Sequence, residues 1–139
     1  MRVERISDEF TKYHLNHEGL LPFYPVLHHF TAPDNSDWND AHDHPWSFTS
    51  YVLKGGYVED VYEVFPNGDW RMESFYRAPG TVHHVSARHI HRITHLPEGE
   101  CWTLVVAGPQ ERETHFWKFD ERGAHCRPWS SDEFTTIGA

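Results

Sequence analysis

Hydrophobic and polar residues alternate with a period of two along most of the chain. After Gly19, short runs rich in Val, Thr, Tyr, Phe and Trp are separated by Gly, Pro, Asn and Asp, a pattern typical of β-strands joined by turns. On this pattern we predict eight strands: Pro25–Thr31, Trp46–Leu53, Tyr57–Phe65, Trp70–Tyr76, Thr81–Val85, His89–His95, Cys101–Ala107 and Thr114–Phe119.

Turn residues stand between these runs. Segments 66–69 (Pro-Asn-Gly-Asp) and 96–99 (Leu-Pro-Glu-Gly) are typical of hairpin turns, and Gly55-Gly56 and Pro79-Gly80 break the remaining runs. Short strands at such close spacing predict an all-β fold, a sandwich or a barrel.

The first residues follow a different period. Phe10 and His14 have helical spacing, Ser7 is suited to cap a helix and Gly19 to end it. We therefore predict a short helical segment within residues 1–20.

No repeat, low-complexity tract or linker divides the chain, so we expect a single domain over residues 1–139. The barrel is expected over residues 25–119. Residues 120–139 are expected to form a C-terminal tail that packs only through Trp129.

Composition narrows the class of protein. The 139 residues carry a formal net charge of −9, which argues against partners with a phosphate surface, namely nucleic acids and anionic membranes. With 38% hydrophobic and 15% aromatic residues the chain can bury a core, which excludes wholesale disorder. No apolar run is long enough to span a membrane. The charged start of the chain is unlike a signal peptide, and Cys101 and Cys126 are too few for a disulfide framework, so a reducing cytoplasm is expected.

The 13 histidines are the unusual feature of the composition. His42 and His44 flank Asp43, and on an extended strand alternate side chains point to one face. Two such imidazoles can bind one metal ion at roughly 2.0–2.2 Å per ligand. The pair alone is weak evidence for a metal site, because two histidines also share a solvated face by chance.

The residues around this pair resemble the two motifs of the cupin superfamily. The first family motif contains HxH, then a glutamate and a glycine, and the second contains a glycine followed by a histidine. His42, His44 and Gly55 match the first motif, and Gly80 and His91 match the second. The resemblance implies a cupin-type jelly-roll β-barrel with a metal site at His42, His44 and His91.

The sequence departs from the family pattern at the fourth ligand. The family glutamate falls on Phe48, or on Ser47 one residue earlier, and neither is a carboxylate. Ser86, Arg88 and His95 replace the proline, glycine and asparagine of the second motif. The resemblance therefore implies a three-histidine variant, or a cupin without its metal, similar to a group of small bacterial and phage cupin-like proteins.

Other residues compete for the third ligand position. Pro-Gly-Thr-Val-His in segment 79–83 can be read as a shorter second motif that nominates His83, whereas His91 preserves the longer family spacing and is preferred. His84 is a candidate fourth nitrogen. Glu59 is either the replacement for the missing carboxylate or, with Asp60, a solvated strand end.

The strand that follows the histidine pair supplies a candidate pocket wall on the same face. With three further histidines, of which His89 is equally a candidate for a packed core residue, the substrate pocket is predicted to contain Trp46, Phe48, Ser50, His83, His84 and His89. Five arginines are candidates to bind a carboxylate or phosphate: Arg71, Arg77, Arg88, Arg92 and Arg112. Tyr51 and Arg92 are the candidate catalytic side chains.

Three functions stay open at this point. The favoured one is a mononuclear non-haem Fe(II) dioxygenase, an oxidoreductase that acts on a small chelating, anionic metabolite. The second is a non-enzymatic cupin that binds a small molecule or a nucleotide-like ligand. The third is a metal-independent sugar isomerase or epimerase in which a histidine is the base and Tyr51 the acid.

Imidazole ligands do not select one metal, so Zn, Ni, Cu and Mn are alternatives to Fe(II). A homodimer is an expectation that rests on the family alone.

Overall fold

The computed structural model describes residues 1–34 and 41–139, and its regular elements are all β-strands. The strands are β1 (Arg2–Ser7), β2 (Phe10–His14), β3 (Pro25–Phe30), β4 (Ala41–His42), β5 (Phe48–Lys54), β6 (Tyr57–Val64), β7 (Trp70–Arg77), β8 (Val82–Val85), β9 (Ile90–His95), β10 (Cys101–Ala107), β11 (His115–Asp120), β12 (Gly123–Pro128) and β13 (Thr135–Thr136). Among the described residues, no helix is long and apolar enough to cross a membrane.

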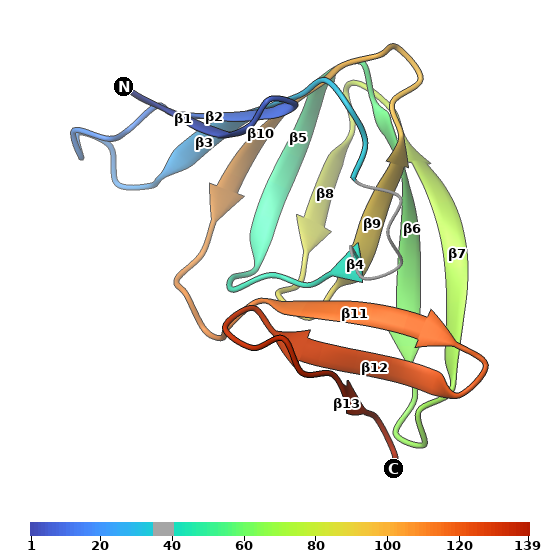
Figure 1. Ribbon diagram of the computed structural model, residues 1–139. Coiled ribbons are helices and arrows are strands. Elements are labelled where there is room, and N and C mark those ends of the chain that lie inside the picture. The colour runs from blue at the N-terminus through green and yellow to red at the C-terminus, as the bar shows by residue number, and fades with distance from the viewer. Residues whose placement is uncertain (35–40) are drawn as a thin grey trace.

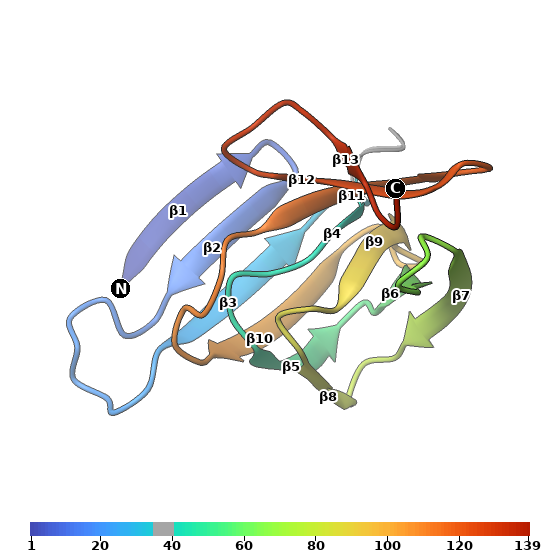
Figure 2. The same cartoon turned by 90° about the horizontal axis from the view of Figure 1, so that it is seen from below.

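Two curled antiparallel sheets face each other (Figures 1 and 2). One has the strand order β1-β2-β3-β10-β5-β8 and the other β13-β12-β11-β4-β9-β6-β7. The all-β prediction is confirmed, and each of the eight predicted strands is present within two residues of its expected ends.

The predicted N-terminal helix is wrong. Residues 2–14 form the β1–β2 hairpin, which extends the six-stranded sheet through pairing of β2 with β3. The Ser7 hydroxyl accepts a hydrogen bond from the Glu9 amide at 3.2 Å, so the residue expected to cap a helix shapes a turn. Phe10 stacks on Phe30 at 4.3 Å between ring centroids, a tertiary contact that favours the extended form.

The C-terminal segment is more regular than the expected tail. β12 forms a hairpin with β11, and β13 pairs with β12, so this segment belongs to the seven-stranded sheet. Trp129, the expected anchor, is 64% exposed. The backbone pairing of β12, rather than Trp129, therefore holds the segment.

The best-buried apolar cluster lies between the sheets, with Phe30 packed against it: Val52, Tyr57, Ile93, Leu96 and Cys101. Cys101 is fully buried, and burial raises the pKa of its thiol to about 11. A thiol held in its neutral form packs as a small hydrophobic group and is a poor nucleophile.

The two-residue strand β4 gives the histidine pair its place in this fold. Its His42 pairs with His91 of β9 on one side and with Phe116 of β11 on the other. The first and second motifs therefore meet inside one sheet, although they are far apart in the sequence.

Candidate metal centre

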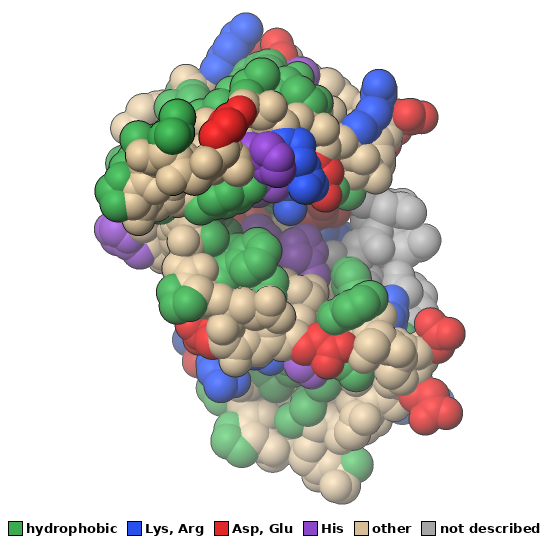
Figure 3. Space-filling model, turned by 90° about the vertical axis from the view of Figure 1, so that its left-hand side faces the viewer, with side chains coloured by type: hydrophobic (Ala, Val, Ile, Leu, Met, Phe, Trp, Pro, Cys, Tyr) green, Lys and Arg blue, Asp and Glu red, His purple; other side chains and the backbone are tan. Residues whose placement is uncertain are grey.

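Three histidines converge from two strands and the segment between β4 and β5. One ring nitrogen from each of His42, His44 and His91 lies within 4.8 Å of the other two. The ring centroids are 5.3 Å apart for His42–His44, 4.8 Å for His42–His91 and 4.9 Å for His44–His91. Figure 3 shows histidine side chains at the bottom of a hollow on one face of the molecule.

Asp43 fixes the backbone between the first two histidines. Its carboxylate is 2% exposed and accepts hydrogen bonds from the His115 amide at 2.6 Å and the Trp117 indole at 3.1 Å. Arg112 forms an ion pair with it at 2.7 Å. Because Asp43 is anchored on the side away from the cluster, His42 and His44 are directed together.

A second set of contacts ties the same segment to β9. The His44 amide donates to the Ala87 carbonyl at 3.0 Å, and the Arg112 guanidinium donates to that carbonyl at 3.3 Å. Ala87 is fully buried just before β9, the strand of His91. Arg112 thus connects the segments that carry the two halves of the cluster.

Glu59 lies behind His91, on the neighbouring strand β6. Its Oε1 accepts hydrogen bonds from His91 Nδ1 and from His89 Nε2, each at 2.9 Å, and its Oε2 accepts one from Arg77 Nε at 2.7 Å. Burial alone would raise the pKa of this carboxyl, but the three donors outweigh burial and hold the pKa far below its usual range.

The prediction of a solvated strand end at Glu59 and Asp60 is wrong. Glu59 is 3% exposed and Asp60 is 9% exposed. Asp60 accepts a hydrogen bond from the Ser74 hydroxyl at 2.6 Å on the opposite face of β6.

Two histidines of the cluster, His44 and His91, are held in their neutral form. Burial lowers the pKa of His44 well below its usual range, and the neighbouring His91 and His42 lower it further. Burial also lowers the pKa of His91, although the hydrogen bond to Glu59 opposes this shift. Neutral imidazole is the form that binds a metal ion.

One nitrogen of the cluster has no protein partner. Among the described residues, His44 Nδ1 is the buried side-chain nitrogen or oxygen atom that makes no hydrogen bond. A buried polar atom without a partner is costly unless a ligand satisfies it. Three converging imidazoles, one of which carries this unpartnered nitrogen, fit a divalent transition metal.

The predicted pocket residues divide between the two faces of their strands. Phe48 is 5.0 Å from His44 between ring centroids, and Ser50 is buried on the same face of β5. His83 is opposite Ser50 in the register of β8, whereas His84 is exposed on the other face and contacts Thr49. His89 lies beside the cluster, 5.1 Å from His91 between ring centroids, and is bound to Glu59. Trp46 is half-buried in the segment before β5.

The structure does not bring the two predicted catalytic side chains to the cluster. Tyr51 is 39% exposed and alternates with the buried residues Ser50 and Val52, so it lies on the outer face of β5. Arg92 follows His91 on β9 and points to the other face, where its guanidinium is 4.0 Å from Asp60.

Most of the candidate arginines are engaged by carboxylates. Arg77 binds Glu59, Arg112 binds Asp43, and Arg71 binds Glu63 on the surface. Arg88 is exposed in the turn before β9. No sequence pattern signals the Asp43–Arg112 pair directly, although strict alternation places the Asp43 side chain on the face opposite to the two histidines.

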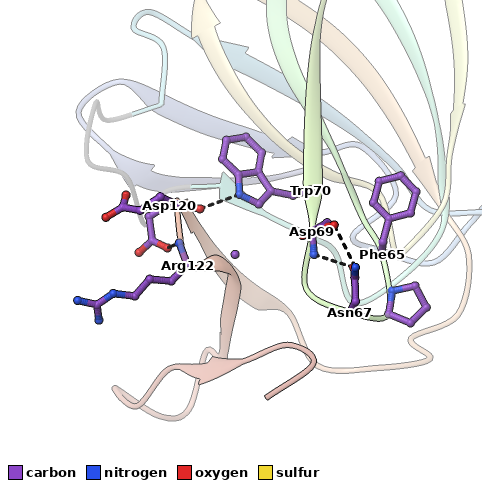
Figure 4. A pocket seen from close by; sticks show the side chains of 9 residues that line it. Phe65, Asn67, Asp69, Trp70, Asp120 and Arg122 are labelled. Atoms are coloured by element: carbon purple, nitrogen blue, oxygen red, sulfur yellow. Dashed lines mark hydrogen bonds between the residues drawn. The ribbon is translucent and has the colours of Figure 1, made fainter.

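A cavity of about 940 Å³ lies away from the histidine cluster, between the β6–β7 and β11–β12 turns (Figure 4). The Trp70 indole donates to the Asp120 carbonyl at 3.0 Å, and the Asn67 amide donates to Asp69 at 3.0 Å. These polar groups satisfy one another, and none of the clustered histidines lines the cavity: its lining is Phe65, Pro66, Asn67, Asp69, Trp70, Asp120, Glu121, Arg122 and Gly123. The cavity therefore lacks the converging imidazoles of the histidine cluster.

The sequence matches no known family profile and no curated protein. The structure is similar to that of hydroxypropylphosphonic acid epoxidase from S. wedmorenis, with a TM-score of 0.55, 16% identity and coverage of 77% of this chain and 55% of that chain. It is also similar to an Fe(II) structure of HppE, with a TM-score of 0.55, 17% identity and coverage of 77% of this chain and 55% of that chain. A third similar structure is that of a cupin-superfamily sugar phosphate isomerase from Silicibacter pomeroyi. Its TM-score is 0.50 at 16% identity, and the match covers 93% of this chain and 77% of that chain.

The chain spans about half the length of the epoxidase, 55% of it. At identities of 16–17% these similarities show a shared fold alone and carry no information about activity.

Proposed function

Because the chain has the cupin fold of these structures, we propose that His42, His44 and His91 hold one divalent transition metal ion, with Fe(II) favoured, in a dioxygenase that acts on a small anionic metabolite. The observation that carries the proposal is the convergence of three imidazoles within 4.8 Å, with a buried nitrogen left without a partner. A structural similarity to an Fe(II) form of HppE supports the choice of iron.

A bound ion of this kind supplies Lewis acidity and a common template for a chelating substrate and dioxygen. The residues of this chain account for the rest of the chemistry. The negative charge of Glu59 is balanced by Arg77, and histidine ligands carry no negative charge, so the charge of the ion is not compensated by the protein. An anionic chelating substrate supplies the missing negative charge.

The walls of the site set what else a substrate contacts. Phe48 takes the position of the family glutamate, so an apolar edge faces His44 where another ligand would be. Ser50 and His83 face inward from β5 and β8 and offer hydrogen bonds to a polar group of a bound molecule. This combination of an apolar wall with few polar groups is typical of small-molecule sites.

The isomerase alternative loses its proposed acid. Tyr51 lies on the outer face of β5, and the mechanism requires an acid within hydrogen-bond reach of the substrate. A non-enzymatic binding protein uses the same hollow and the same histidines, and is distinguished from the oxygenase only by measurement.

Metal analysis of protein purified without a histidine tag tests the site. We expect close to one equivalent of a transition metal in the wild type and its loss in the double variant His42→Ala/His44→Ala. His95→Ala is the matched control, because His95 is an exposed histidine at the end of β9. A wild-type protein with no affinity for Fe(II), Zn(II) or Ni(II) would overturn the proposal.

Oxygen consumption by the Fe(II)-loaded protein tests the activity. We expect uptake on addition of some of a panel of small chelating acids, such as 2-oxo and 2-hydroxy acids, and none in the double variant. Tight binding of these acids without oxygen uptake would instead identify a metal-dependent binding protein.

A further inference from the structure

A carboxylate lies beside the cluster although the motif position for a carboxylate ligand holds Phe48. Glu59 comes from β6, which pairs with β9, and it reaches His91 diagonally across the register in which Val61 is opposite His91. Its Oε1 forms a hydrogen bond of 2.9 Å with His91 Nδ1, so this ring nitrogen is occupied by Glu59. The side chain is 3% exposed, so water does not compete for this contact.

This hydrogen bond determines the tautomer of His91. An ionised carboxylate has no proton to donate, so His91 Nδ1 must carry the hydrogen and Nε2 must carry the lone pair. The ring is therefore oriented with its acceptor nitrogen free for an ion. Carboxylates that hold the second nitrogen of a histidine ligand in this way fix its orientation and raise its basicity.

Glu59 is itself fixed by the groups around it. Arg77 Nε binds Oε2 at 2.7 Å, and His89 Nε2 shares Oε1 with His91 at 2.9 Å. A carboxylate with three donors is held in one rotamer, and its charge is matched by Arg77. The side chain is therefore suited to orient His91 and is not free to swing toward His42 and His44.

We propose that Glu59 is a positioning residue for His91 and acts from outside the coordination sphere in place of the carboxylate ligand that the first motif lacks. This inference rests on the proposed metal site at His42, His44 and His91. The ligand concerned is a divalent transition metal ion.

Glu59, His89 and His91 also lie close enough to one another to be considered as ligands themselves, since one atom of each lies within 4.8 Å of the others. The two arrangements share His91 but differ in the role of His89. A positioning role for Glu59 makes His89 dispensable for binding an ion, whereas direct ligation makes it essential.

Titration of the metal-free protein with Co(II), followed by its visible absorption, separates these roles. We expect Glu59→Gln to bind Co(II) 10–100-fold more weakly than the wild type with a changed spectrum, because a neutral amide accepts less strongly from His91. Glu63→Gln, which alters a surface carboxylate on the same strand, is expected to bind as the wild type does. His89→Gln is expected to retain one equivalent of Co(II).

The outcomes distinguish this inference from the proposed function. If the wild type and Glu59→Gln bind Co(II) equally, the positioning role is overturned and the three-histidine site stands. If His89→Gln loses Co(II) while His42→Ala retains it, the ion binds Glu59, His89 and His91, and both assignments are wrong. A wild-type protein that binds no Co(II) overturns both.

Circular dichroism and thermal unfolding of each metal-free variant show whether a loss of affinity reflects a loss of fold. If Glu59→Gln does not fold, Glu59→Asp provides the same comparison. It keeps the charge and shortens the reach to His91, so weaker binding is again expected, and wild-type affinity would overturn the positioning role.

Discussion

Gly55 ends the first motif and Gly80 begins the second, and the structure requires glycine at the two positions for different reasons. Both have positive backbone angles, with φ of +86° in each case, which disfavours any residue with a Cβ atom. A Cβ at Gly55 would lie 1.9 Å from the backbone oxygen of Glu100, whereas a Cβ at Gly80 meets no atom within 4 Å. The first glycine is therefore needed for space as well as for conformation.

This difference predicts unequal costs for the same substitution. We expect Gly80→Ala to lower the free energy of unfolding by about 1–2 kcal/mol, the cost of a left-handed conformation. Gly55→Ala should cost about 3 kcal/mol or more, because the start of β10 must also move. Urea denaturation of the two variants measures both values, and equal values would show that the contact with Glu100 relaxes freely.

The local part of the histidine site was predictable from the sequence, and the long-range part was not. Alternation alone brings His42 and His44 together. The choice between His83 and His91 depends on the sheet to which each strand belongs: β8 lies in the six-stranded sheet and β9 pairs with β4 in the other. The same alternation, applied strictly, places Tyr51 on the outer face of β5.

At the scale of elements, strand pairing overrides local preference at the N-terminus. Ser7, Asp8 and Glu9 favour a helix start, but the same side chains favour turns. Every residue of β2 is also paired with a residue of β3, with Lys12 opposite His28. A pattern with both periods is decided by the partner strand, which a local reading of the sequence does not contain.

The buried ion pair between Asp43 and Arg112 supports the link between β11 and the histidine pair, together with the hydrogen bonds of Asp43 to β11. We expect Arg112→Met to lower the free energy of unfolding by about 3–5 kcal/mol, because Asp43 is left buried with an uncompensated charge. The double variant Asp43→Asn/Arg112→Met should recover much of this loss. Arg71→Met is the matched control, because it removes an exposed ion pair and should change stability little.

Chemical denaturation of the wild type, Asp43→Asn, Arg112→Met and the double variant gives the coupling between Asp43 and Arg112. If Arg112→Met is no more harmful than Arg71→Met, the pair does not anchor β4 to β11. Metal affinity gives a second measure, since loosening the Asp43 backbone separates His42 from His44.

At the scale of the whole molecule, the net charge of −9 does not reveal that several buried histidines are held neutral. His28, His44 and His91 all have lowered pKa values, and burial is the largest cause in each case. Burial depends on how the two sheets close on each other, so composition could show the excess of histidine but not which rings are withheld from protons. The acidity of the chain as a whole is therefore a poor guide to its response to pH.

His28 provides a measurable case, away from the proposed metal ligands. It packs edge-on beside the stacked pair Phe10 and Phe30, at 5.2 and 6.0 Å between ring centroids. Burial, reinforced by Lys12 and His14, lowers its pKa to about 3. The unfolded chain, with a histidine pKa of about 6.5, binds this proton more readily than the folded one. The contribution of His28 to stability is therefore complete above about pH 6.5 and declines as the pH falls toward 3.

We expect this single group to add a slope approaching about 1.4 kcal/mol per pH unit to the unfolding free energy between pH 6 and about pH 4. In His28→Gln the slope should fall by up to this amount, because the amide does not titrate, while His17→Gln, an exposed matched control, should keep the wild-type slope. Urea denaturation of chelator-treated protein at several pH values measures the three slopes. An unchanged slope in His28→Gln would mean that the site beside Phe10 and Phe30 admits a charged ring, which requires β2 to separate from β3 in acid without unfolding of the rest.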